Sequence, residues 1–219
     1  MKKTFIVANW KSNFTSSEAD FWFQRFKNYD LRIMNKEIII CPSFTLLSEI
    51  ESVIKNYELG FKIGAQNVSP FDEGAYTGEV SARQIKEFAD YVLIGHSERR
   101  TNFNENDEIL FKKAELSKQH GLAPIFCVQG IETKIPSDIA IVAYEPINAI
   151  GTGRPDTAES AQEVAAFFKK NYKVQYVLYG GSVTSENVKK FTQMSNIDGV
   201  LVGGASLDAQ EFYAIIKNA

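Results

Sequence analysis

The stretch IAIVAYEP, residues 139–146, decides the fold of this chain. Its first five residues are apolar, which is typical of a short strand that is buried on both faces of a parallel sheet. Glu145 follows where that strand ends, and Pro146 leads into a loop of small residues with two glycines. A helix is expected next, because apolar residues recur at helical spacing from Ala161 to Phe168. A carboxylate in this position suits a general base beneath a mobile loop, although a Glu-Pro pair alone is more often a solvated turn.

Apolar runs of the same kind recur from one end of the chain to the other. Most are followed by an amphipathic segment, such as the apolar face between Ala19 and Phe26. No linker or low-complexity segment interrupts the alternation. We therefore predict an α/β fold, a closed (β/α)8 barrel that forms a single domain over residues 1–219, in preference to an open doubly wound sheet. The predicted strands are Thr4–Ala8, Ile38–Cys41, Phe61–Ala65, Tyr91–Gly95, Ala123–Val128, Ile139–Ala143, Gln175–Tyr179 and Gly199–Val202.

One unit of this barrel is too short. Only residues 130–138 separate the fifth and sixth predicted strands, whereas a parallel crossover normally needs at least about 10–12 residues. The chain of 219 residues is also shorter than the roughly 250 that are typical of this fold. We expect the fifth helix to be missing or reduced to a short turn. In its place we expect Ile131, Ile135 and Pro136 to fold inward as a plug over the neighbouring strands.

The composition argues against several classes of partner. Of the residues, 44% are hydrophobic and 23% charged, and the formal net charge is -3. Nucleic acids and anionic membranes favour a basic surface, so we expect neither as a partner. The apolar run near Met1 is too short for a signal peptide, and no stretch reaches transmembrane length. Cys41 and Cys127 each lie in an apolar run, which predicts buried free thiols and a cytoplasmic location.

Polar residues and glycines follow five of the predicted strands, at the point where each strand ends. In a barrel of this kind the carboxyl ends of all strands meet at one rim, where catalytic residues gather. Together these residues would supply a base, an imidazole, an ammonium group and backbone N–H donors, which a catalytic site needs. They are Asn9 and Lys11 after the first strand, His96 after the fourth, Glu145 after the sixth, Gly180 to Ser182 after the seventh, and Gly203 and Gly204 after the eighth.

Each of these residues has a structural interpretation as well. Taken alone, Lys11 is more often a surface lysine, and His96 is as often structural as functional. His120 precedes Gly121 at a helix end, where we expect it only to interact with the helix dipole. The glycine pairs could form tight turns, but after the seventh and eighth strands this fold commonly binds phosphate. The Gly-Thr-Gly at residues 151–153 lacks the third glycine of a dinucleotide site, and we reject that interpretation.

With these motifs in place, the chain resembles the triosephosphate isomerase family. The resemblance covers almost the whole chain, and its motifs occur in the family's order. It implies a TIM barrel and an isomerase that interconverts dihydroxyacetone phosphate and D-glyceraldehyde 3-phosphate in glycolysis and gluconeogenesis, without a cofactor or a metal. The segments that carry it are Asn9–Lys11, Cys41–Thr45, Gly64–Asn67, Gly74–Glu79, Gly95–Arg100, Tyr144–Pro146, Tyr179–Ser182 and Val202–Ser206.

The resemblance also implies a role for each candidate residue. Glu145 would transfer the proton between two substrate carbons, and a neutral His96 would donate to the substrate oxygens as an enediolate forms. Lys11 would offset the negative charge, and Asn9 would position an oxygen beside it. Proton abstraction next to a carbonyl needs such a base and such fixed donors. The phosphate would lie on the backbone N–H groups of Gly151, Ser182, Gly203 and Gly204.

A homodimer is the assembly that the resemblance implies. The segment Val68 to Glu79 is similar to the loop that family members insert beside a partner's active site. Its aromatic residues Phe71 and Tyr76 otherwise lack a place to pack. We expect Thr77 to lie near the partner's Asn9 and the partner's Glu98.

Several departures from the family fall near one another. The family usually has Trp where this chain has Asn148, in the hinge of the lid over the active site. Its fifth strand usually ends Cys-x-Gly-Glu, where this chain has CVQG at residues 127–130, and the helix after that Glu is absent here. Arg154 stands for a usual Lys at the far hinge and alters the geometry. These changes spare the three catalytic candidates, so we expect activity with altered lid kinetics.

Two other functions stay open from the sequence alone. Another phosphate-binding barrel enzyme, such as a sugar-phosphate isomerase or an aldolase, would need a Schiff-base lysine or a metal cluster at a strand end. Lys11 is the strand-end lysine, and no cluster of His and Asp accompanies it. A non-catalytic barrel would have little need of Lys11, His96 and Glu145 in register.

Overall fold

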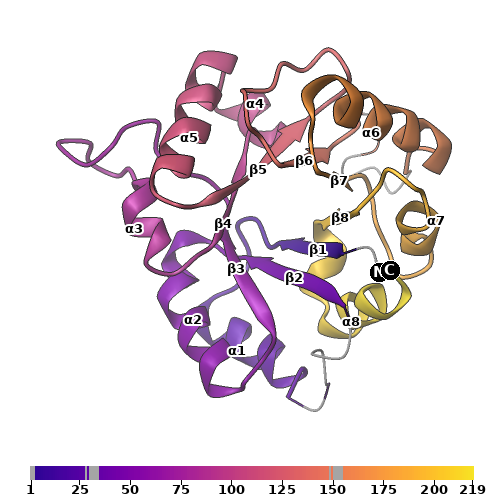
Figure 1. Cartoon of the computed structure of the whole chain (residues 1–219). Helices are drawn as coiled ribbons and strands as arrows, with labels where there is room; N and C mark the ends of the chain where they lie inside the picture. The colour runs from indigo at the N-terminus through magenta and orange to yellow at the C-terminus, as the bar shows by residue number, and fades with distance from the viewer. Residues whose placement is uncertain (1–2, 28, 30–34, 148, 150–154) are drawn as a thin grey trace.

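The computed structural model describes residues 3–27, 29, 35–147, 149 and 155–219. In these residues, parallel strands pair in chain order and close into a barrel, with β1 hydrogen-bonded to both β2 and β8 (Figure 1). The predicted (β/α)8 architecture and all eight predicted strands are confirmed. The strands are β1 Thr4–Asn9, β2 Lys36–Cys41, β3 Phe61–Ala65, β4 Tyr91–Ile94, β5 Ala123–Val128, β6 Ile141–Tyr144, β7 Tyr176–Tyr179 and β8 Gly199–Val202.

Helices surround this barrel, and side chains at their first turns explain where several of them begin. Asn106, Thr157 and Asp208 each accept a hydrogen bond from a backbone N–H of the helix that follows. The α-helices are α1 Ser16–Gln24, α2 Leu47–Asn56, α3 Ala82–Lys86, α4 Ser97–Asn102, α5 Asp107–Gln119, α6 Ala158–Tyr172, α7 Val188–Thr192 and α8 Ala209–Asn218. Two short 3-10 helices, η1 Phe44–Leu46 and η2 Gly204–Leu207, follow β2 and β8.

The strands are buried on both faces and therefore contribute to two separate cores. Because successive side chains of a strand point to opposite faces, alternate residues enter the barrel interior and the layer beneath the helices. In β6, Ile141 and Ala143 face the interior, whereas Val142 and Tyr144 pack under the helices. The interior cluster consists of Phe5, Val7, Ile39, Cys41, Leu93, Ile125, Cys127, Ile141, Ala143, Leu178 and Leu201.

The connection from β5 to β6 contains no helix. Residues 129–140, all of which are described, form turns that are held by a bond from the Thr133 N–H to the Gly130 carbonyl (3.1 Å) and by one from the Gln129 N–H to Thr133 Oγ1 (3.0 Å). The expectation of a missing fifth helix is confirmed. The sixth strand begins at Ile141 rather than at Ile139, because the chain is still turning before that point.

The expected plug over the strands is only partly right. Ile135 is 8% exposed and packs with the apolar layer under the helices, as predicted. Ile131, by contrast, is 46% exposed, so it does not fold inward, and Pro136 is half-buried. Val128 and Val142, which face this layer from β5 and β6, are completely buried. Ile135 and Ile139, which is 3% exposed and belongs to the same apolar layer, therefore cover the two strands from this connection.

Both cysteines are free and buried inside the barrel, as predicted. Burial raises the pKa of the Cys41 thiol and of the Cys127 thiol, which keeps both protonated. None of the described helices is both long and apolar enough to span a membrane.

Candidate active site

The strand periodicity that fills the barrel interior also aims the candidate residues at one point. Ile141 and Ala143 face the axis, so Glu145, two residues on, faces it as well; the same argument takes β1 from Val7 to Asn9. A cavity of about 640 Å³ lies at this rim. Seven of the predicted site residues line it, namely Asn9, Lys11, His96, Glu145, Ser182, Gly203 and Gly204.

His96 is oriented by the turn before it and the helix after it. Gly95 has a left-handed backbone (φ 74°), which turns the chain out of β4, and a Cβ there would lie 2.9 Å from the guanidinium of Arg100. His96 then caps α4, because its Nδ1 accepts the backbone N–H of Glu98 at 3.2 Å. A nitrogen that accepts this bond carries no proton, so the ring is neutral and the proton lies on Nε2. That proton faces Glu145.

Glu145 is 2% exposed, and both of its carboxylate oxygens have partners. Oε1 lies 2.9 Å from Nε2 of His96, and Oε2 accepts the backbone N–H of Ser97 at 2.9 Å. A buried carboxylate without such partners would cost several kcal/mol. Room for the side chain exists because residue 180 is glycine, where a Cβ would lie 3.1 Å from the Glu145 Cγ.

A thiol lies close to this carboxylate. After burial, the negative charge of Glu145 is the largest influence that raises the pKa of Cys127, and a hydrogen bond between the two side chains adds to it. Since the thiol stays protonated, it can donate to the carboxylate but cannot act as a nucleophile in this state.

Lys11 enters the cavity from the loop after β1. Its backbone is left-handed (φ 53°), and its Nζ lies 2.5 Å from Oε1 of Glu98. The Lys11 N–H donates to Asn9 Oδ1 at 3.1 Å, while Nε2 of Gln66 donates to the Lys11 carbonyl at 2.8 Å. The unusual backbone is thus held from both sides, which fixes where the ammonium group enters.

The loops after β7 and β8 form the side of the cavity where a phosphate is predicted. Ser182 is left-handed (φ 49°), its hydroxyl donates to the carbonyl of Ala149, and its own carbonyl accepts a bond from Nδ2 of Asn187 at 3.0 Å. Gly203 precedes η2, whose first N–H groups are free of helical partners by geometry. These loops carry no bulk at Gly203 and Gly204, so an anion can approach the backbone.

Part of the predicted site lies outside the described residues. Gly151, one of the four predicted phosphate-binding residues, belongs to this part, as do Asn148 and Arg154, where the chain departs from the family. Nothing in the geometry tests these three predictions.

Several residues of the site were not predicted. Ser97 acts through its backbone N–H, and Gln66 and Asn187 hold loops, so no charged or nucleophilic side chain marks them in the sequence. Lys190 and Glu186 also line the cavity, from α7 and the turn before it. Among the described residues, His, Cys, Asp and Glu do not gather in a group of three that could bind a metal.

Comparisons with known proteins agree with this geometry. A family model described as triosephosphate isomerase matches residues 4–219. A triosephosphate isomerase of Mesomycoplasma hyopneumoniae (strain 232) is 40% identical over 245 aligned positions, which cover 99% of this chain and 100% of the relative. That of Endomicrobium trichonymphae is 38% identical over 249 positions, 99% of each chain, and that of Dictyoglomus thermophilum is 37% identical over 252 positions, 100% of each.

The length of these alignments bears on the missing helix. They extend over 245 to 252 positions, so the relatives carry positions that this chain of 219 residues lacks. A barrel without its fifth helix agrees with such a deletion. With a family match over nearly its whole length, and with the barrel and the rim residues in place, the chain belongs to the triosephosphate isomerase family.

Proposed function

We propose that Glu145, His96 and Lys11 carry out the isomerisation for which the family is named. The reaction interconverts dihydroxyacetone phosphate and D-glyceraldehyde 3-phosphate, a step of glycolysis and gluconeogenesis, through an enediolate. The observation that carries the proposal is the pairing of Glu145 with a neutral His96 at 2.9 Å, inside one cavity with Lys11. A base, a neutral donor and a cation are the groups that proton transfer next to a carbonyl needs.

In this mechanism Glu145 removes a proton from the carbon beside the carbonyl and returns it to the neighbouring carbon. Both oxygens of Glu145 are now occupied, by Ser97 and His96. Bound substrate must therefore take the place of at least one of these partners. Once the Nε2–H of His96 turns from Glu145 to the substrate oxygens, it stabilises the charge that develops there, and the carboxylate is free to act as the base.

The negative charges of the substrate would be balanced by Lys11 and by backbone N–H groups of residues that line the cavity. Lys11 is paired with Glu98, and a phosphate dianion or an enediolate would compete for the same ammonium group. We assign Asn9 to positioning a substrate oxygen beside it. The phosphate would bind to the backbone N–H groups of Ser182, Gly203 and Gly204, and of Gly151 from the lid, because backbone donors favour an anion without a buried side-chain charge.

A coupled assay tests this proposal. The protein converts D-glyceraldehyde 3-phosphate to dihydroxyacetone phosphate, which an added NADH-dependent dehydrogenase then reduces. The loss of NADH therefore reports the rate of isomerisation. We expect His96→Gln to lower kcat roughly 10²–10⁴-fold. His120→Gln, the matched change at the other histidine, should keep the parent rate; His120 Nε2 lies 3.1 Å from Asp72 Oδ1, so its role is not limited to the helix dipole as expected. An aldolase would instead cleave a ketose bisphosphate, and a non-catalytic barrel would bind the substrate without turnover; either result excludes our proposal.

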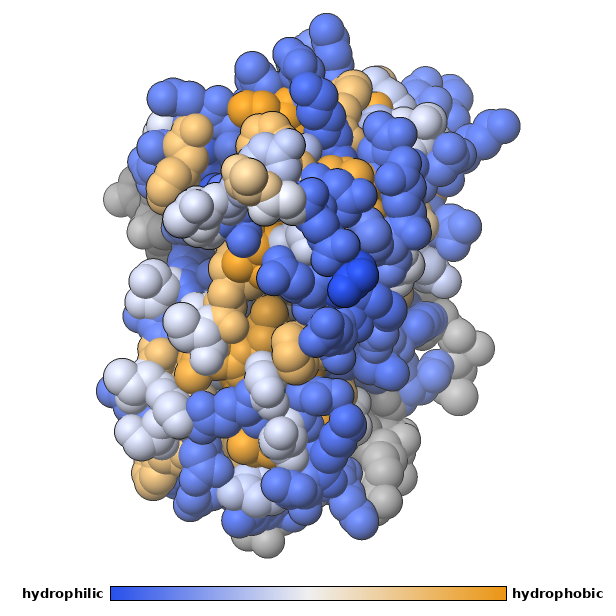
Figure 2. Space-filling view, turned by 90° about the vertical axis from the view of Figure 1, so that its left-hand side faces the viewer, coloured by the Kyte–Doolittle hydropathy of each residue, from blue (hydrophilic) through white to orange (hydrophobic). Residues whose placement is uncertain are grey.

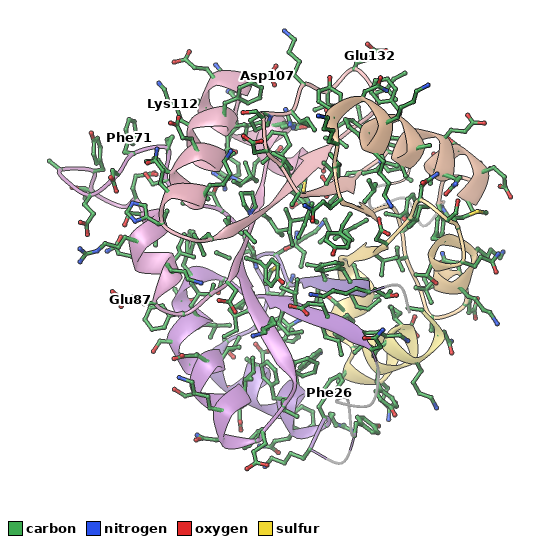
Figure 3. All side chains as sticks on the ribbon, in the orientation of Figure 1. Phe26, Phe71, Glu87, Asp107, Lys112 and Glu132 are labelled. Atoms are coloured by element: carbon green, nitrogen blue, oxygen red, sulfur yellow. The ribbon has the colours of Figure 1, made fainter. Side chains whose placement is uncertain are left out.

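We further propose that the chain functions as a homodimer in the cytoplasm. The loop between β3 and α3 extends from the barrel, and the rings of Phe71 and Tyr76 on it stack at 4.3 Å although each is nearly half exposed (Figures 1 and 3). Phe44, the first residue of η1, and Phe103, which directly follows α4, are exposed as well. Figure 2 shows apolar side chains among hydrophilic ones on the face that carries this loop. A surface of this kind supports burial against a second copy.

The dimer can be tested with one pair of variants. We expect Phe71→Asp to give a monomeric mass by light scattering at micromolar concentration, with reduced activity, because Thr77 would no longer reach the partner's Asn9. Phe21→Asp on α1, which changes a side chain that is even more exposed, should leave the dimer intact. A parent protein that is monomeric and fully active contradicts the proposal.

The buried free thiols support the cytoplasmic location, since thiols persist in a reducing compartment.

A further inference from the structure

We infer that Asp156 is a positioning residue for the catalytic base, acting through the hydroxyl of Tyr144. The inference rests on the proposed role of Glu145. Tyr144 is the last residue of β6 and directly precedes Glu145, while Asp156 lies at the opposite end of the connection that follows, next to α6. The Tyr144 hydroxyl donates to Oδ2 of Asp156 at 3.2 Å. One side-chain bond thus joins the two ends of the segment from Tyr144 to Asp156, which contains the catalytic base Glu145.

The carboxylate of Asp156 is held by its own surroundings. Ser160, in the first turn of α6, donates its hydroxyl to Oδ2 at 2.9 Å, and the Thr157 N–H donates to Oδ1 at 2.8 Å. Capping of α6 is the task of Thr157, whose hydroxyl accepts the Ser160 N–H. Asp156 is therefore not needed as the helix cap, and its Oδ2 accepts hydrogen bonds from both Ser160 and Tyr144.

A second tyrosine fixes the backbone of the same residue. The Asp156 N–H donates to the hydroxyl of Tyr179 at 2.8 Å, and the ring of Tyr179 is stacked on Phe191 at 3.8 Å and is 1% exposed. Tyr179 directly precedes Gly180, which makes room for Glu145. Asp156 consequently contacts the last residue of β6 through its side chain and the last residue of β7 through its backbone.

These contacts bear on the base because they add side-chain hydrogen bonds to the backbone bonds that join the strand ends. The Gly180 N–H donates to the Tyr144 carbonyl at 2.8 Å, and the Glu145 N–H donates to the Val128 carbonyl at 2.7 Å. These two backbone bonds fix the position of the Glu145 backbone. They still allow the end of β6 to rotate about the line that joins the two bonds. A tyrosine ring anchored at its hydroxyl prevents that rotation, and displacements of about 1 Å are enough to slow proton transfer greatly.

The test is a double-mutant cycle with Tyr144→Phe and Asp156→Ala. We expect each variant to lower kcat roughly three- to thirtyfold, with KM changed less than about threefold, because the base moves while the phosphate loops after β7 and β8 remain. The double variant should lose no more than the more affected single variant, since both remove one bond. Glu159→Gln removes a charge from the same first turn of α6, at an exposed position, and should keep the parent kcat.

All rates are measured well below the melting temperature of each variant, so loss of stability alone changes none of them. Parent kcat in either single variant overturns the inference, and so does an additive loss in the double variant. A rise in KM with unchanged kcat also overturns it, because the residue would then serve phosphate binding. Failure of the proposed function looks different: it is an inactive parent protein, or an active Glu145→Gln variant.

Discussion

Two neighbouring connections of the barrel differ in whether they only cover the strands or also hold catalytic residues. The β4–β5 connection spans 28 residues, 95–122, with α4 and α5, and it carries His96 and Ser97, which hold the base. The β5–β6 connection spans 12 residues, 129–140, without a helix and without a proposed catalytic residue. Both leave the strands beneath them buried, as Val92 and Val142 are each 0% exposed. Covering a strand requires only apolar side chains, whereas holding catalytic atoms requires a capped helix start.

The difference explains why a helix could be lost from one connection and not from the other. A loop with two buried isoleucines, Ile135 and Ile139, excludes water as a helix does, since burial is non-directional. The bonds to Glu145 are directional, and they come from the backbone at the start of α4.

The largest effect is expected where the base meets the β4–β5 connection. Glu145→Gln should lower kcat by at least roughly 10²–10⁴-fold, because Glu145 is proposed to serve in both proton transfers. The fold should persist, since an amide can still bond to Ser97. Glu132→Gln in the helix-free connection changes an exposed glutamate and should leave kcat at the parent value (Figure 3). Near-normal turnover of Glu145→Gln would mean that another group is the base.

The next largest effect is expected in stability rather than in rate. Ile135→Asp should lower the free energy of unfolding by about 2–5 kcal/mol, because it removes a buried side chain and introduces a charge in its place. Ile131→Asp, in the same loop but 46% exposed, should change it by less than about 0.5 kcal/mol. Both values follow from denaturant titration. If the two variants unfold alike, the loop does not cover the strands and our comparison is wrong.

A smaller effect is expected from the turn that shapes the helix-free connection. Thr133→Val removes the hydroxyl that accepts the Gln129 N–H and should cost about 1 kcal/mol, the usual net value of such a bond. Thr133→Ser keeps the hydroxyl and should retain most of that stability. A loss in Thr133→Ser together with parent stability in Thr133→Val, again by denaturant titration, would show that packing of the methyl group, rather than the hydrogen bond, fixes the turn.

The smallest effect is expected only at alkaline pH and concerns Tyr144, the last residue of β6. Burial, aided by the charge of Asp156 and the bond to it, raises the pKa of Tyr144 to about 12. An unfolded tyrosine ionises near pH 10, so between pH 10 and 12 the unfolded chain releases a proton that the folded chain keeps. The contribution of Tyr144 is thus complete below pH 10 and is lost as the pH rises toward 12.

Thermal melts at pH 9 and pH 11.5 check this expectation. The melting temperature of the parent should fall more between these two conditions than that of Tyr144→Phe. Tyr91 and Tyr179 stay in both proteins, and since burial also raises the pKa of each, some alkaline loss remains in the variant. Parallel losses in the two proteins would show that Tyr144 ionises as readily in the folded state as in the unfolded state.

The barrel and the position of its rim residues could be predicted because they follow from order and periodicity. Asn9, His96 and Glu145 each stand just after an apolar run, and a parallel barrel brings all such positions together. The short connection was also predictable, since a crossover that includes a helix needs at least about 10–12 residues and the predicted strands leave scarcely that. These inferences need only the counting of residues along the chain.

What could not be predicted depends on geometry that side-chain identity does not encode. Ser97 bonds to the base through its backbone, which every residue has. Ile131 and Ile135 have the same side chain in the same short loop, and only the path of the turns decides which of them is buried. Asp156 looks like one more residue before a helix until the hydroxyl of Tyr144 is found beside it.

The two thiols enclosed by the barrel can report how often the barrel opens. Cys41 and Cys127 are both 0% exposed and lie in the interior cluster, so a thiol reagent reaches them only when strands separate. Their labelling rate therefore counts opening events of the barrel rather than fluctuations of its outer loops. Because Cys127 lies close to Glu145, the labelling rate of its thiol also reports how often the strands beneath the catalytic base separate.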